Sequence, residues 1–148
     1  MYNIVYINML NSNDRIYDLE ACEKIIEDFK NKPICYGCIE KMDDDFKSSV
    51  CIEKMDDLNV NEISHVVENM WIENNILKAD IRILDSRFGR ILKNMGNVRF
   101  ATQSYGSINL DKTANISKFV TLNAVVFKDW AYSKYELREE KLKRILNL

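Results

Sequence analysis

Two alternating apolar segments, residues 63–72 and 76–84, constrain the fold of this 148-residue chain most strongly. Each has the alternation and the content of β-branched residues that are typical of a β-strand. The residues between them, Glu73–Asn75, favour a turn. The sequence therefore predicts two strands joined by a short turn, and the only histidine of the chain, His65, lies on the first of them.

The other segments predict further strands and helices. Residues 2–10, 98–101 and 117–127 have the composition of strands. One helix is expected to begin after an N-cap at Asp18 and to end before Pro33, because proline disfavours continuation. Further helices are expected from a cap at Asp85 or Ser86 to about Met95, and from Tyr132 onward.

These elements predict an α+β fold, which is a small, mostly antiparallel β-barrel or sheet with two or three flanking helices. Roughly five to seven strands are expected. We expect a single domain over residues 1–131. The amphipathic helix within residues 132–148 is expected to pack on this domain or to extend from it, with Tyr135, Leu142, Ile145 and Leu146 as its packing stripe.

Composition and charge exclude several classes of function. Hydrophobic residues make up 47% and charged residues 30% of the chain, which is ordinary for a globular protein. The formal net charge of −2 provides no general attraction to nucleic acid or to anionic membranes. No apolar segment has the roughly 18–20 residues that span a bilayer, and the N-terminus lacks the features of a signal peptide. We therefore expect an intracellular protein with neither nucleic acid nor a membrane as its partner.

Four cysteines, Cys22, Cys35, Cys38 and Cys51, lie in the first third of the chain. The C-Y-G-C segment at 35–38 has the spacing of a metal or redox pair, but a zinc site would require the fold to bring all four thiols together. Reduced thiols without a cofactor or metal are the favoured prediction, because buried cysteines commonly act as small hydrophobic residues.

The heptapeptide C-I-E-K-M-D-D occurs twice, at 38–44 and again at 51–57. A local duplication within a surface loop, or a matched pair of strands, is the favoured interpretation, because two short copies cannot build a solenoid. The alternative is a cation-binding loop formed by Asp43–Asp45 and Asp56–Asp57. The order of these residues does not match the alternating ligands of an EF-hand.

The residues best suited to chemistry are His65 and a group of hydroxyls that follows it. Histidine is a natural general base near neutral pH. Thr102, Ser104 and Ser107 are candidate nucleophiles beside Gly106, whose backbone is expected to form an oxyanion-binding turn. Together they predict a hydrolytic site. The alternative interpretation is a hydrogen-bonded structural histidine and an ordinary Gly/Ser turn.

The order of four motifs resembles that of a known family. N-S-N-D-R-I-Y-D at 11–18 is followed by I-S-H-V-V-E at 63–68, I-L-D-S-R-F-G-R at 83–90 and F-A-T-Q-S-Y-G-S at 100–107. This order is similar to that of the prohead (capsid maturation) proteases of tailed phages, which are serine endopeptidases with the herpesvirus assemblin-type fold. The similarity spans about residues 3–127, and the order and spacing of its short motifs carry it.

The resemblance implies roles for particular residues. His65 matches the catalytic histidine of the family, and the segment Leu84–Arg90 matches a family turn, with Ser86 where the family has threonine. The nucleophile strand matches Phe100–Ser107, but Ala101 occupies the position of the nucleophilic serine, and Gln103 replaces an arginine. The later strand, residues 122–126, also lacks the acidic residue that the family pattern implies.

Three explanations for Ala101 remain open. It is an engineered serine-to-alanine change, the mark of a natural inactive relative, or the result of a shifted alignment in which Ser104 is the nucleophile. The resemblance thus implies a capsid maturation protease-like protein of a virus, inactive as written if Ala101 holds the nucleophile position. The alternative is a non-catalytic virion or scaffold-associated binding protein.

The resemblance also implies the partners and the location of the protein. Its partners would be viral scaffold and capsid proteins, met in the host cytoplasm, the prohead or the virion. Association between copies of the chain is left open.

Overall fold

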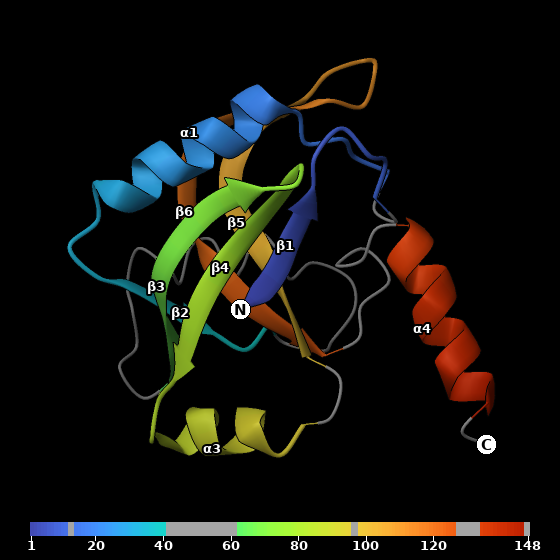
Figure 1. Cartoon of the computed structure of the whole chain (residues 1–148). Helices are drawn as coiled ribbons and strands as arrows, with labels where there is room; N and C mark the ends of the chain where they lie inside the picture. Colours follow the sequence, from blue (N-terminus) through green and yellow to red (C-terminus); the bar gives the residue numbers. More distant parts are fainter. Residues whose placement is uncertain (12–13, 41–61, 96–97, 127–133, 147–148) are drawn as a thin grey trace.

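The computed structural model describes residues 1–11, 14–40, 62–95, 98–126 and 134–146, which form six strands and three helices (Figure 1). The strand pairs within its two sheets are antiparallel. The predicted α+β class, with mostly antiparallel strands and two or three helices, is therefore confirmed.

The larger sheet has four strands in the order β1-β4-β3-β2. The predicted hairpin at its centre is confirmed, because β3 pairs with β4 along nearly its whole length. Asn74 and Asn75 form the turn at φ values of 53° and 62°, a left-handed conformation that asparagine tolerates better than most residues. The strands of this sheet are β1 (Tyr2–Tyr6), β2 (Cys35–Cys38), β3 (Ile63–Glu73) and β4 (Ile76–Ile83).

The second sheet is a long hairpin of β5 (Val98–Ile108) and β6 (Ala114–Val126). The predicted Gly/Ser turn at residues 102–107 is wrong, because this segment continues β5 and stays paired with β6. The pairing of β5 with β6 is irregular at two points, since its register shifts after Gln103 and after Tyr105. Beyond each shift the two strands stay paired, through Gly106 to Ile108.

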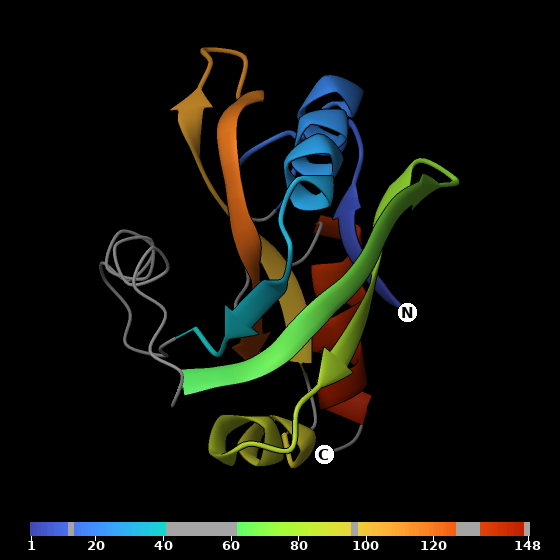
Figure 2. The same ribbon diagram turned by 90° about the vertical axis from the view of Figure 1, so that its left-hand side faces the viewer.

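The two sheets lie side by side, but no closed barrel forms among the described residues (Figure 2). The barrel part of the fold prediction is therefore not confirmed. On one side, a parallel bridge joins Ile39 to Ala124, and the N–H of Glu40 donates to the carbonyl of Ala124 at 2.8 Å. On the other side, the rings of Tyr2 in β1 and Phe100 in β5 meet edge to face at 4.7 Å. These contacts bring the hairpin close to both edges of the larger sheet.

Helix α1 (Leu19–Lys30) packs against β6 and β3 and covers part of the core. The side chain of Asp18 accepts a hydrogen bond from Ala21 N–H at 2.8 Å, which confirms the predicted N-cap. Asp28 on the same helix accepts the backbone N–H of Phe119 at 2.9 Å, so the helix is bonded directly to β6.

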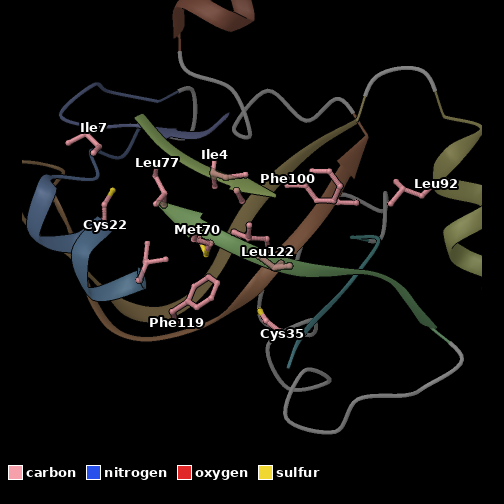
Figure 3. Close-up of a cluster of buried hydrophobic side chains, with 14 residues drawn as sticks. Ile4, Ile7, Cys22, Cys35, Met70, Leu77, Leu92, Phe100, Phe119 and Leu122 are labelled. Carbon is pink, nitrogen blue, oxygen red and sulfur yellow. The ribbon is translucent and has the colours of Figure 1, made fainter. Parts of the chain in front are cut away.

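The core lies between the larger sheet, the hairpin and α1 (Figure 3). Full burial of one large apolar side chain contributes about 1.5–3 kcal/mol, so this cluster is the main source of stability. Its buried members are Ile4, Ile7, Cys22, Ile25, Cys35, Val67, Met70, Leu77, Ala79, Leu92, Phe100, Phe119, Leu122 and Ala124.

Helix α3 (Arg87–Lys93) begins after Ser86, one of the two predicted caps. The Ser86 hydroxyl accepts the N–H of Gly89 at 3.0 Å and donates to the carbonyl of Ile63 at 2.8 Å. One side chain therefore starts the helix and fixes it to β3. Leu92 buries the inward face of α3, whereas Ile91 is 39% exposed.

Helix α4 (Lys134–Leu146) makes no extensive contact with the other described elements. Leu142, Ile145 and Leu146 are 51%, 66% and 75% exposed, so these members of the predicted packing stripe do not enter the core. No helix in the described part of the chain is long and apolar enough to cross a membrane.

Substitution of Ser86 by alanine should lower the free energy of unfolding by about 1–2 kcal/mol, because both the cap and the contact with Ile63 are lost. Urea denaturation followed by circular dichroism measures this change. Ser117→Ala is a matched control, since its hydroxyl donates to the Tyr105 carbonyl at an exposed position, and should cost less than about 0.5 kcal/mol. Equal effects of the two substitutions would refute the role of Ser86.

Candidate functional site

His65 lies on β3 between its two partner strands, opposite Ile83 of β4 and Gly37 of β2. Its side chain is 0% exposed. Such burial of a polar ring is stable only where its nitrogens are hydrogen-bonded.

Both ring nitrogens of His65 have partners inside the protein. Nε2 lies 2.8 Å from the carbonyl oxygen of Leu122, and Nδ1 lies 2.7 Å from the hydroxyl of Ser64. A carbonyl only accepts, so the proton is assigned to Nε2, and Nδ1 then accepts from the Ser64 hydroxyl. The neutral ring thereby satisfies one donor and one acceptor.

The ring reaches Leu122 by passing over Gly37 of the neighbouring strand. A Cβ atom at Gly37 would lie less than 3.0 Å from both His65 Nε2 and the Leu122 carbonyl oxygen. On another side, the ring of Phe100 contacts His65 edge to face at a centroid distance of 4.8 Å. Glycine is therefore required at position 37 for the hydrogen bond between β3 and β6 to form.

Burial lowers the pKa of His65 from 6.5 to about 4, against a smaller opposing effect of the bond to Leu122. The imidazole is therefore neutral at pH 7. An effective general base needs both a pKa near the working pH and a reacting proton within reach. His65 lacks the first, and its only acceptor atom, Nδ1, already faces Ser64.

The candidate nucleophile positions all lie on β5. Successive residues of a strand point to opposite faces, so Ala101 points away from the face on which Phe100 meets His65. The hydroxyl of Thr102 lies 3.4 Å from that of Tyr17. The hydroxyl oxygen of Ser104 is buried without a hydrogen-bond partner among the described residues. His65 therefore forms no hydrogen bond with any of the three.

Gly106, the expected centre of an oxyanion-binding turn, lies within β5 opposite Ile116. Its backbone belongs to a strand ladder instead of a turn. The structure thus does not gather the predicted base, nucleophile and oxyanion donors at one point.

Ala101 is opposite Asn123 of β6, beside a buried pair of amides. The side chain of Asn123 donates to that of Gln103, and it also accepts the backbone N–H of Cys38 at 3.4 Å. Gln103 and Asn123 are 6% and 3% exposed. The groups in these two hydrogen bonds are neutral amides.

The described cysteines are free thiols. Cys22 and Cys35 are buried, and burial, together with the carboxylates of Asp18 and Glu23, raises the pKa of Cys22 to about 12. A thiol with this pKa is not ionised at neutral pH and is a poor nucleophile. In the described ranges no three His, Cys, Asp or Glu side chains are grouped to hold a metal ion. Cys51 and the acidic segments of the repeat lie outside the described residues.

The residues that determine the state of His65 were not among the predicted site residues. They are Ser64, Gly37 and Leu122. Ser64 could have been suspected from its position next to the histidine. Gly37 stood inside the C-Y-G-C segment, where the spacing of the cysteines suggested metal or redox chemistry. The carbonyl of Leu122 has no signal in the sequence, because every residue has one.

No protein-family model, curated protein or solved structure matches this chain.

His65 should make stability depend on pH in a defined window. The unfolded chain binds a proton below about pH 6.5, whereas the folded protein binds it only below about pH 4, so stability is full above the window and falls as the pH decreases. We expect a loss of about 2.5 kcal/mol at about pH 4.5 relative to pH 7. Urea denaturation at the two pH values measures it.

The control for this experiment is His65→Gln, whose amide can still donate to Leu122 but does not titrate. The loss of stability of the His65→Gln variant between the two pH values comes from the carboxylates alone. The additional loss in the wild type is the contribution of His65. An identical pH dependence in both proteins would contradict the assignment.

Proposed function

We propose that this chain is a non-catalytic binding protein of a viral head, with a fold related to that of the prohead proteases. The observation that carries the proposal is the state of His65, whose two ring nitrogens are bonded inside the core to Ser64 and Leu122. A base in this state has no free nitrogen to take a proton from an incoming nucleophile.

The nucleophile position supports the same proposal. Ala101 carries no hydroxyl, and the alternation of β5 directs its side chain away from the histidine ring. A serine at this position would therefore not by itself form the hydrogen-bonded pair that nucleophilic catalysis by serine requires. The order of motifs along the chain supports the relation to the prohead proteases.

A protein partner suits the surface of the chain. The net charge of −2 argues against a general affinity for nucleic acid. Three apolar side chains on α4, those of Leu142, Ile145 and Leu146, are more than half exposed. We propose that this face of α4 contacts viral scaffold or capsid proteins, which would be met in the host cytoplasm or inside the prohead.

The second candidate function is a serine endopeptidase that cleaves scaffold and capsid precursors. One observation favours it. The hydroxyl of Ser64 lies 2.7 Å from His65 Nδ1, which is the distance of an activated serine from its base. Ser64 is 0% exposed, however, so a substrate would reach it only after the strands around it separate.

A serine-directed fluorophosphonate probe separates the two candidates. We expect no labelling of the protein or of its Ala101→Ser variant above that of His65→Gln, because the one described hydroxyl bonded to the histidine, that of Ser64, is buried. Mass spectrometry of the intact protein measures the labelling. Labelling that requires His65, or cleavage of the cognate scaffold protein that His65→Gln abolishes, would establish the endopeptidase instead.

Co-expression with the scaffold and capsid proteins of the same virus tests the binding function. The wild type and a folded His65→Gln variant should co-purify with them equally, whereas Leu142→Asp with Ile145→Asp should reduce co-purification at least tenfold. Leu110→Asp is the matched control, because Leu110 is also exposed but lies on the hairpin loop. Failure of the wild type to associate with any head protein would overturn the proposal.

A further inference from the structure

The hairpin of β5 and β6 ends in a loop, residues 109–113, whose leucine faces solvent. The side chain of Leu110 is 107% exposed, more than any other large apolar side chain that the structure describes, and Ile108 just before the loop is 45% exposed. A single exposed leucine is ordinary on a protein surface. Its significance therefore depends on how rigidly the loop holds it and on which surface could receive it.

The hairpin loop is held in one conformation by bonds on both of its sides. The N–H of Asn109 donates to the Thr113 carbonyl, and the N–H of Lys112 donates to the Asn109 carbonyl, each at 2.9 Å. Lys112 has a left-handed φ of 73°, and its ammonium pairs with Asp14 at 2.9 Å. A side chain on a fixed loop loses little conformational freedom when it binds, so Leu110 is preorganised for a contact.

Helix α4 has the spacing of residues that receives such a side chain. In packed helices, a side chain of one element inserts into a hole formed by residues i, i+3, i+4 and i+7 of the other. Arg138, Lys141, Leu142 and Ile145 have this spacing, and all four are exposed. Leu146 extends the apolar side of the hole, because it lies one turn from Leu142 on the same face.

We propose that Leu110 of one copy of the chain inserts into this hole on α4 of a second copy. The hairpin loop and the C-terminal end of α4 lie well apart in the structure, so they do not cover each other within one chain (Figure 1). The contact is heterologous, since each copy contributes a different surface. A pair of copies keeps one unoccupied loop and one unoccupied helix, and association continues into an open chain or closes into a ring.

Charge complementarity favours this pairing of loop with helix. The exposed charged side chains described on α4 are Arg138, Glu139, Lys141 and Lys143. Cations thus predominate around the hole, whereas the residue after the inserted leucine is the exposed Asp111. Two α4 helices placed face to face would bring these cations together, and two loops placed tip to tip would bring two Asp111 carboxylates together. Only the contact of loop with helix places opposite charges side by side.

The contact is small, because it consists of one loop and part of one helix. Contacts below the standard interface size are weak, and we expect a Kd on the order of 100 μM. The same face of α4 is the one proposed above to bind head proteins, so copies of the chain and head proteins compete for it. This consequence rests on the proposed function. The self-association is measured without any head protein, so the two proposals fail separately.

Sedimentation equilibrium of the purified chain from about 10 to about 500 μM, a range that brackets this Kd, tests the proposal. The average mass of the wild type should rise with concentration past that of a dimer. Leu110→Asp should remain monomeric, and so should the double variant Leu142→Asp with Ile145→Asp. Ile34→Asp is the matched control, because Ile34 is 56% exposed and belongs to neither surface, and it should associate as the wild type does.

An equal mixture of the two monomeric variants identifies the pairing. The Leu110→Asp chain keeps its helix and the Leu142→Asp, Ile145→Asp chain keeps its loop, so the mixture should form a complex of two chains and nothing larger. Contact between two helices predicts that Leu110→Asp alone still dimerises, and contact between two loops predicts the same of the helix variant. Either result, a monomeric wild type, or a mixture without a complex would overturn the proposal.

Asp111→Asn isolates the contribution of charge, because an amide oxygen can still accept the N–H of Thr113 and keep the loop closed. Introduced into the chain that keeps its loop, it should weaken the complex in the mixture by about two- to fivefold, the usual effect of one exposed ion pair. An unchanged Kd would contradict the proposed arrangement, in which Asp111 faces the cations of α4.

Discussion

The hydrogen bond from His65 to the carbonyl of Leu122 joins the two sheets of this protein, and β2 lies against β6 around it. A strand edge leaves backbone N–H and carbonyl groups that must find partners when they are buried. Where β2 lies beside β6, those partners are largely side chains. The Leu122 carbonyl accepts a hydrogen bond from His65, and the Tyr36 carbonyl accepts one from the hydroxyl of Thr121. The Cys38 N–H donates to the side chain of Asn123. Bonding between backbone groups follows at Glu40, whose N–H donates to the Ala124 carbonyl.

The two ring nitrogens of His65 that catalysis would need are already used in hydrogen bonds to Ser64 and Leu122. A general base must accept a proton from the nucleophile and then carry a positive charge. Here protonation of Nδ1 would reverse the direction of its hydrogen bond with the Ser64 hydroxyl and place a cation in a buried site. The depressed pKa of His65 expresses this cost. A histidine that holds the sheets together is thus poorly placed to act as a base unless the strands move apart.

The sequence was sufficient for the parts of the fold that rest on local patterns. The Asn74–Asn75 turn, the cap at Asp18 and the cap at Ser86 each use a preference of the residue itself. The extension of β5 through Gly106 was missed, since its polar and glycine residues resemble a turn until β6 is paired with them. Contacts between distant segments had no local signal. The state of His65 was of this kind, because it is determined by a backbone carbonyl 57 residues away.

These contacts place different requirements on positions 65 and 101. Ala101 points away from His65, and its small side chain lies beside amides that bond to each other, so the fold does not require a hydroxyl there. Loss of His65 would remove the donor to the Leu122 carbonyl in the core, and a buried group left unsatisfied costs about 1–3 kcal/mol. Position 101 is therefore open to other side chains, whereas a replacement of His65 keeps the contact with β6 only if it can still donate to Leu122. The proposed non-catalytic function accounts for this combination of a buried, hydrogen-bonded histidine and an alanine at position 101.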